Sequence, residues 1–254
     1  MRGAVLAAVA LTAVAGSAAA QDPSTWTLTE RDGVTMAHTT FQSRVAVIAR
    51  CADRQFSVLL QGVPTPTDNM VVTTIVDGST DLSGRWWLAE DGKMLLSRRP
   101  ATFARGLAEG RTATVSGQNS DGRSWTVETP LPQDREPLDA VLQACGVPLS
   151  DPRDRLAPGG RDALNAAPVA LHWERMPTPE WPDRALGKGL TQGLVVMTCI
   201  TGPAGALRDC RSESELPVGG NFGREAVRAA NDARLSPDTP VGALVEFDIT
   251  FLMR

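Results

Sequence analysis

Four cysteines and two histidines are the residues of this 254-residue chain whose types could cross-link the chain or bind a metal ion. They stand at Cys51, Cys145, Cys199, Cys210, His38 and His172. Metal binding needs Cys and His at close ligand spacing, and neither histidine lies near a cysteine pair. An even cysteine count therefore favours two disulfides, and we expect no metal and no cofactor. Four cysteines allow three pairings; distance along the sequence suggests Cys51–Cys145 and Cys199–Cys210.

Catalytic chemistry finds little support in the sequence. The chain has no tyrosine, and a Ser–His–Asp or Cys–His nucleophile needs a base that the two isolated histidines do not supply. The stretch Gly219–Gly223 has the glycines of a phosphate loop but no following Lys–Ser/Thr, so we interpret it as a loop before a helix. Glu213 and Glu215 are expected to be solvated. We predict a non-enzymatic protein without catalytic residues.

Two adjacent tryptophans, Trp86 and Trp87, are candidates for binding another molecule. Neighbouring side chains on a strand face opposite sides, so one tryptophan should enter the core and the other should meet solvent or a partner. Large aromatic side chains are common contact residues at protein interfaces.

The first twenty residues indicate export. Arg2 precedes a short apolar run of Ala, Val and Leu, and Ser17-Ala18-Ala19-Ala20 has the small residues that signal peptidase requires. We expect a cleaved Sec signal over residues 1–20 and a periplasmic mature chain in a Gram-negative bacterium, with no integral membrane segment after cleavage. The net charge of −4 becomes −5 without Arg2, and this gives no reason to expect a nucleic acid partner.

The mature chain is long enough for two domains. Residues 151–167 are rich in proline, glycine and charge, and we predict a linker there. Residues 23–150 contain six or more short strand-like runs separated by turn signals, with helical patterns only over 101–108 and 137–144. We expect an all-β sandwich or barrel with one or two short helices and the disulfide Cys51–Cys145.

Some features of residues 23–150 are similar to a known β-sandwich family. They are Arg50-Cys51 entering a strand, a central Trp strand, and Leu142-Gln143-Ala144-Cys145-Gly146 closing a helix. Together they resemble the invasion-associated locus B proteins and the periplasmic accessory proteins of type VI secretion. That resemblance implies an accessory role in a secretion or envelope system. A secreted hydrolase with its site in residues 23–150 is the other alternative.

Residues 168–254 predict a small α+β domain. Gly193–Thr201 and 206–212 form a hairpin around a turn at 202–205, which places Cys199 opposite Cys210. Asn221 is expected to cap a helix from Phe222 to about Leu235. The last strand, Val241–Met253, alternates, so Val245, Phe247, Ile249 and Phe251 point to one side.

This order of elements and several motifs resemble the C-terminal domain of TonB energy transducers. The matching residues are Trp173, Pro177, Trp181, Pro182, Ala185, Gly193, Val195, Cys199, Gly205, Cys210, Glu215, Pro217, Phe222 and Gly223. The resemblance implies binding of a short receptor peptide along the last strand, at Val245, Phe247, Ile249 and Phe251. Trp181 and Pro182 are further contact candidates.

The chain departs from a TonB transducer in lacking the uncleaved N-terminal helix and the long proline-rich spacer. Family likeness in residues 168–254 therefore does not imply energy transduction. We expect a binding or adaptor protein linked to TonB-type outer-membrane transport, whose partner is a periplasmic protein or peptide such as a segment of a TonB-dependent receptor. The sequence leaves the oligomeric state open.

Overall fold

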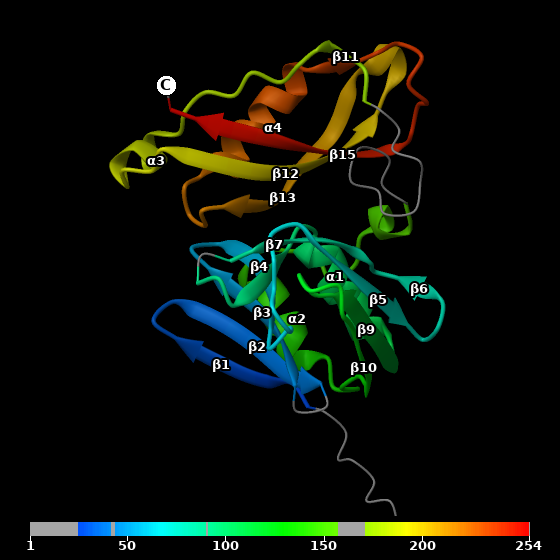
Figure 1. The fold of residues 1–254 in the computed structure, drawn as a ribbon. Helices are drawn as coiled ribbons and strands as arrows, with labels where there is room; N and C mark the ends of the chain where they lie inside the picture. Colours follow the sequence, from blue (N-terminus) through cyan, green and yellow to red (C-terminus); the bar gives the residue numbers. More distant parts are fainter. Residues whose placement is uncertain (1–24, 42–43, 90, 157–170, 254) are drawn as a thin grey trace, which may run out of the picture.

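The structure, a computed structural model, describes residues 25–41, 44–89, 91–156 and 171–253. It is mostly β, with several sheets and few helices. Residues 25–156, called here the N-terminal part, lie below residues 171–253, the C-terminal part, in the view of Figure 1. Within the described ranges no helix has both the length and the apolar character needed to cross a membrane. The expected signal peptide at 1–20 lies outside them.

The N-terminal part is built on one antiparallel sheet. Its strands run in the order β1-β2-β3-β4-β8-β7-β5-β9-β10, with β6 paired to β5. They are β1 Thr27–Arg31, β2 Val34–Phe41, β3 Val45–Ala52, β4 Gln55–Gln61, β5 Met70–Val76, β6 Thr80–Asp81, β7 Gly84–Leu88, β8 Met94–Ser97, β9 Thr112–Gln118 and β10 Ser124–Pro130. The expected sandwich or barrel thus takes the form of a single open sheet, in which β10 nevertheless contacts β2.

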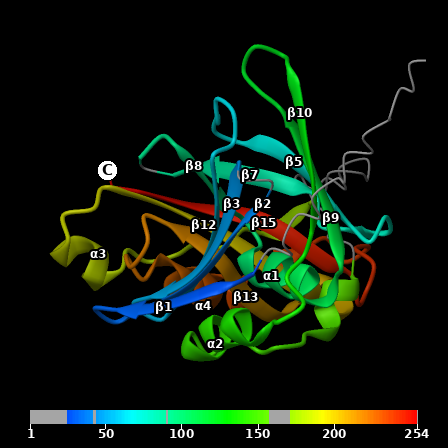
Figure 2. The same ribbon diagram turned by 90° about the horizontal axis from the view of Figure 1, so that it is seen from below.

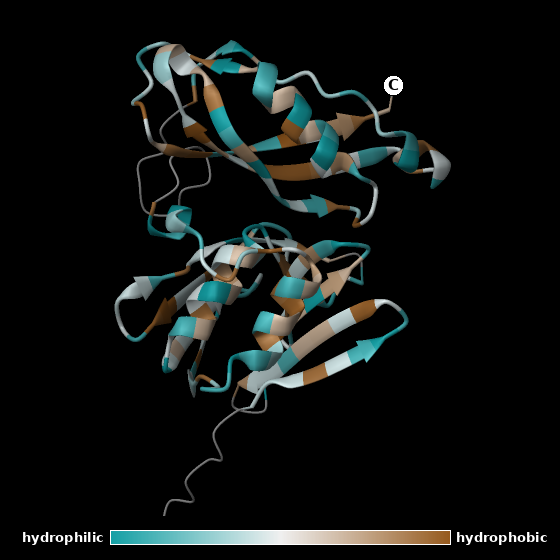
Figure 3. Ribbon diagram, turned by 180° about the vertical axis from the view of Figure 1, so that it is seen from behind, coloured by the Kyte–Doolittle hydropathy of each residue, from teal (hydrophilic) through white to brown (hydrophobic). Residues whose placement is uncertain are grey.

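Two helices fill the core of this sheet. Alternate residues of β3 (Val45, Val47, Ala49 and Cys51) are buried, as a strand with one covered face requires. Helix α1, Pro100–Glu109, packs on β4, and α2, Glu136–Ala144, packs on β2 and β3. Figure 2 shows the two helices side by side, and Figure 3 shows polar and apolar residues mixed along the strands. The disulfide Cys51–Cys145 joins β3 to the end of α2, as predicted.

The C-terminal part contains a three-stranded antiparallel sheet of order β13-β12-β15. Its elements are β11 Trp173–Arg175, α3 Asp183–Gly187, β12 Gln192–Thr201, the 3-10 turn η2 Pro203–Gly205, β13 Leu207–Leu216, α4 Phe222–Asp232, β14 Arg234–Leu235 and β15 Leu244–Leu252. Helix α4 packs on β12 and β13. The predicted hairpin, helix and final strand are therefore present in that order.

Several boundaries differ from the prediction, and the second hairpin strand, expected to end at residue 212, continues to Leu216. Helix α4 ends at Asp232, not Leu235, because Arg234 and Leu235 form the strand β14, which pairs with β11. The buried Leu235 side chain continues the apolar pattern of the helix and so hides the change of structure. The last strand begins at Leu244 rather than Val241.

The hairpin of β12 and β13 carries the second predicted disulfide, Cys199–Cys210, with Cα atoms 4.1 Å apart. The pairing is irregular beside it. Thr198 faces Arg211, whereas Ile200 faces Arg208, and Asp209 has a φ of 47°. At the turn, Gly205 has a φ of 70°, and a Cβ there would lie 1.9 Å from the carbonyl oxygen of Leu235, so only glycine fits.

The start of the predicted linker is ordered structure. Pro152–Arg155 form a 3-10 turn, η1, and the Asp151 side chain accepts a hydrogen bond from the Arg153 N–H at 3.0 Å. The turn lies against the C-terminal part, because Asp151 and Arg153 bond to residues of β12 and β13. The remainder of that prediction, residues 157–167, lies outside the described ranges.

Candidate functional site

The two parts meet through apolar side chains. Leu59 of β4, Trp87 of β7 and Leu96 of β8 form a buried cluster with Val196 of β12. Helix α4 covers the other face of the C-terminal sheet, so this sheet is covered on both sides. We call this contact between the two parts the junction.

Trp86 and Trp87 point to opposite sides of β7. Trp86 lies in the N-terminal core, with its ring 5.0 Å from Phe103 in an edge-to-face arrangement. Trp87 lies in the junction, where the Arg98 guanidinium stands 5.3 Å from its ring centre. Both tryptophans are 2 % exposed. The partner expected for the outward tryptophan is therefore the C-terminal part of the same chain.

Arg98 binds the last strand across the junction. Its guanidinium donates hydrogen bonds to Asp248 at 2.6 and 3.1 Å and to Glu246 at 3.4 Å. Ser214 of β13 donates to the Arg98 carbonyl oxygen at 3.0 Å. Because Arg98 is 4 % exposed, its charge depends on these carboxylates for compensation.

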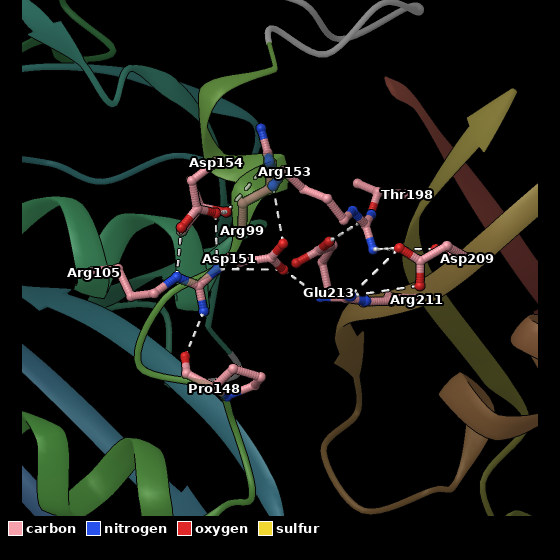
Figure 4. A network of polar contacts seen from close by, with 11 residues as sticks. Arg99, Arg105, Pro148, Asp151, Arg153, Asp154, Thr198, Asp209, Arg211 and Glu213 are labelled. Carbon is pink, nitrogen blue, oxygen red and sulfur yellow. Dashed lines mark hydrogen bonds and ion pairs between the residues drawn. The ribbon is translucent and has the colours of Figure 1, made fainter. Parts of the chain in front are cut away.

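A second set of ion pairs joins η1 and the neighbouring Asp151 to α1 and to the C-terminal part (Figure 4). We call it the junction network; its residues are Arg105, Asp151, Arg153, Asp154, Thr198, Asp209, Arg211 and Glu213. Arg105 binds Asp154 through two nitrogens, at 2.5 and 2.8 Å. Arg153 donates to the Asp209 carbonyl oxygen at 3.1 Å and to Thr198, and lies 3.7 Å from Glu213. Arg211 donates to Asp151.

Burial and neighbouring charges shift the pKa values of this network. Burial alone would raise the pKa of Asp151, but the N–H of Arg153 and the charges of Arg211, Arg153 and Arg105 hold it below its usual value. Burial lowers the pKa of Arg153. For Arg105 the same burial is outweighed by Asp154, which raises the pKa of the guanidinium.

A cavity of about 540 Å³ opens beside this network. Its walls come from the β3–β4 turn, the start of α1 and η1 on one side, and from β13 and the start of α4 on the other. Neither histidine lines it, and its cysteine, Cys145, is disulfide-bonded. The lining is dominated by arginine and carboxylate side chains, which bind by charge and hydrogen bonds.

Strand β15 lies at the end of its sheet. Met253 N–H donates to Thr191 O, and Thr201 N–H donates to Ala243 O, so odd-numbered residues of β15 bond to β12. The side chains of Val245, Phe247, Ile249 and Phe251 are buried in the core under α4. The backbone groups that point away from β12 therefore belong to the even-numbered residues, and not to the four that the sequence suggested.

The arm before α3 packs on the core through its tryptophans. Trp173 contacts Phe247, and Trp181 contacts Phe222 and Phe251, with ring centres 5.0 to 6.2 Å apart. Pro182 is buried. In the sheet pairings of the described residues, the arm's strand β11 joins β14 and not β15. Trp181 and Pro182, expected as contact residues, thus hold the arm in place.

Glu213 and Glu215 are not the solvated pair that the sequence suggested. Glu213 lies in the junction network with its side chain 12 % exposed. Glu215 is buried and accepts hydrogen bonds from the backbone N–H groups of Gly219, Asn221 and Gly223 at 2.6 to 3.1 Å. Asn221 is the N-cap residue of α4, as predicted, but its side chain makes no capping bond. The carboxylate of Glu215 takes the loop amides that a phosphate would need.

The residues that could hold a metal are dispersed. In the described ranges no group of three or more His, Cys, Asp or Glu side chains is placed to hold a metal ion. His172 is exposed in the arm, and His38 is half-buried on β2.

No protein-family model matches the sequence, and no curated protein compared with it is similar.

Proposed function

We propose that this chain is a periplasmic, non-enzymatic adaptor related in its C-terminal part to the TonB C-terminal domain, and that it binds an extended peptide along the outer edge of β15. The peptide would come from an envelope protein such as a TonB-dependent receptor. The observation that carries the proposal is the place of β15 at the end of the β13-β12-β15 sheet. An end strand can accept another strand through its backbone, which is a common mode of peptide recognition.

The chemistry of the edge favours its C-terminal half. Leu252 and Met253 are 66 % and 47 % exposed, and Thr250 is exposed as well. Towards the other end, Leu244 and Glu246 are buried, and Glu246 pairs with Arg98 of the N-terminal part. A bound peptide would therefore pair over residues 248–252 and place an apolar side chain beside Leu252. The disulfides fit the oxidising compartment that the proposal requires.

The test is an NMR titration of oxidised residues 21–254 with receptor-derived peptides of about eight residues, which is within the usual range of strand lengths. We expect saturable shifts of the Thr250 and Leu252 amides, since these N–H groups point outward. Two N-methylated peptides provide a matched control. One peptide carries methyl groups on its odd-numbered residues and the other on its even-numbered residues. In one of them the methyl groups face β15 and block the backbone hydrogen bonds, and in the other they point away, so only one of the two peptides should lose binding.

Absence of shifts at millimolar peptide, or equal binding by both N-methylated peptides, would contradict strand addition. A result of that kind would leave the three-stranded sheet as a scaffold for the junction.

A further inference from the structure

We propose that the cavity at the junction binds a small, multiply charged anion that carries carboxylate or phosphate groups. The inference does not depend on peptide binding at β15, because the cavity is lined by the β3–β4 turn, α1, η1, β13 and the start of α4. Its volume of about 540 Å³ lies in the range of small-molecule sites.

The lining is positively charged in a chain that is negative overall. Seven arginines and five acidic residues line the cavity, whereas the whole chain has a formal charge of −4. Clefts of one sign concentrate ligands of the opposite sign. The charge of this cavity therefore selects against cations and favours anions.

The five carboxylates are already engaged within the protein. Arg105 holds Asp154, Arg211 holds Asp151, and Arg153 lies beside Glu213. Asp53 pairs with Arg184 at 3.1 Å, and Glu215 binds the backbone of the 219–223 loop. The acidic lining is thus used to hold the cavity walls together.

Two of the arginines that line the cavity form no ion pair with a carboxylate of the described residues. Arg54 and Arg99 have no carboxylate within 4 Å among the described residues; the Arg99 side chain donates to the Thr102 hydroxyl at 3.3 Å, and its backbone N–H donates to the Ser97 hydroxyl at 3.2 Å. Arg54 is exposed, and the β3–β4 turn, in which it has a φ of 64°, presents it at the rim. Guanidinium groups bind carboxylate and phosphate through paired hydrogen bonds.

The start of α1 adds backbone donors to the same wall. Arg99 is the N-cap residue of this ten-residue helix, and no side chain caps its first turn. Pro100, Ala101 and Thr102 line the cavity. Uncapped N–H groups at a helix N-terminus favour an anion. The Arg99 guanidinium and the N-terminus of α1 thus both favour an anion at this wall of the cavity.

Across the cavity, Arg224 at the start of α4 reaches the same space from the C-terminal part. Its side chain is 74 % exposed, and within the described ranges its one ion pair is with Glu225 at 3.4 Å. An anion with charged groups at both ends would contact Arg54 or Arg99 on one side and Arg224 on the other. A single-charge anion could not bridge them, so the ligand class is a di- or tricarboxylate or a polyphosphate.

The experiment is calorimetric titration of the full mature protein with citrate and, separately, with pyrophosphate, at low salt to limit screening. We expect saturable binding of one or both. Citrate alone would identify a carboxylate ligand, and pyrophosphate alone a phosphate ligand. The variants Arg99→Gln and Arg54→Asn should weaken binding about tenfold, the loss of one charge-assisted hydrogen bond.

The matched control is Arg31→Gln, which removes the same charge from an exposed residue of the β1–β2 hairpin, outside the cavity lining. It should leave the affinity unchanged. The Arg54→Asn variant, at an exposed turn that asparagine tolerates, keeps the test valid if Arg99→Gln unfolds the protein. No saturable signal with either anion, or the same loss in the control as in the two variants, would overturn the proposal.

Discussion

Glu215 shows how one buried carboxylate can organise a loop and a helix end at once. It accepts three backbone hydrogen bonds from the 219–223 loop and so satisfies donors at the start of α4. Helix N-termini without such acceptors are unfavourable when buried. The side chain therefore replaces the cap that the Asn221 side chain does not provide.

Replacing Glu215 with alanine should lower the free energy of unfolding by about 2–4 kcal/mol, because three buried N–H groups lose a charged acceptor. Urea unfolding measures the change, and faster hydrogen exchange at Gly219 and Gly223 would locate it. Glu109→Ala, at the exposed end of α1, is the control and should change stability by less than about 0.5 kcal/mol. Equal effects of the two variants would contradict the role given to Glu215.

Asp151 gives a pH dependence with a defined sign. Its pKa is lowered in the folded protein, so its contribution is present above the unfolded value of about 3.9 and is lost as pH falls through the folded pKa. The stability difference between the protein and Asp151→Asn should be constant near neutral pH and should shrink in acid. Urea unfolding across the acid range measures it. A difference that stays constant into strong acid would count against this prediction.

At the residue scale, the sequence predicted which cysteines form disulfides but not the environments of the acidic residues. The cysteines and their pairing were predictable from their count and spacing. The places of Glu213 and Glu215 were not, since two acids at a strand end have the same local pattern whether they face water or a distant arginine. Only the fold brings Arg153 and the loop amides to them.

At the scale of elements, the two disulfides constrain loops of very different length. Cys51 and Cys145 are 94 residues apart, whereas Cys199 and Cys210 are 11 apart. Chain entropy therefore predicts a stabilisation of about 4–5 kcal/mol for the first and about 3 kcal/mol for the second.

The test compares two double variants, Cys51→Ala/Cys145→Ala and Cys199→Ala/Cys210→Ala, by urea unfolding. The first should be the less stable. All four replacements are cysteine to alanine, so the side-chain terms are similar and the difference reports loop length. The opposite order would show that strain or packing, not chain entropy, decides the contribution.

Strands and helices were largely predictable where a periodic pattern was long. The alternation of β15 and the apolar stripe of α4 gave both elements, because each buries one face. The predicted end of α4 was wrong, because the Leu235 side chain would be buried equally well in a helix or in the strand β14. The single open sheet of the N-terminal part was also hidden, because strand order depends on pairings between distant segments.

At the scale of the whole molecule, the junction should make the two parts unfold together. It buries Trp87, Arg98 and Arg153, each of which contacts residues from the other part. We expect one urea transition, seen alike by tryptophan fluorescence and circular dichroism.

Arg98→Met should lower the free energy of unfolding by about 3 kcal/mol, because it leaves the buried Glu246 carboxylate with less compensation. Combined with Arg153→Met, it should separate the unfolding of the two parts into two transitions. Arg31→Met, in an exposed ion pair, should leave the single transition in place. Two transitions in the unchanged protein would show that the junction does not couple the parts.

The junction itself left no pattern in the sequence. Arg98 and Asp248 are 150 residues apart, and the charged start of the predicted linker, residues 151–156, looks solvated until its partners are known. The hydrophobic periodicity of a segment predicts its helix or strand. A contact between two folded surfaces brings together segments that are far apart in the sequence, so it produces no periodic pattern. This is why one of the two adjacent tryptophans could be predicted to face solvent or a partner, but neither which of the two nor what it faces could be identified.

Neither disulfide crosses the junction: one lies within the N-terminal part and the other within the C-terminal part. Apart from the backbone between Leu156 and Leu171, the two parts are held by contacts that can dissociate and re-form. Two separately expressed fragments, residues 21–156 and 171–254, should therefore assemble into the same structure when mixed. Their assembly would depend on concentration, and the dissociation constant of the pair would measure how strongly the junction holds.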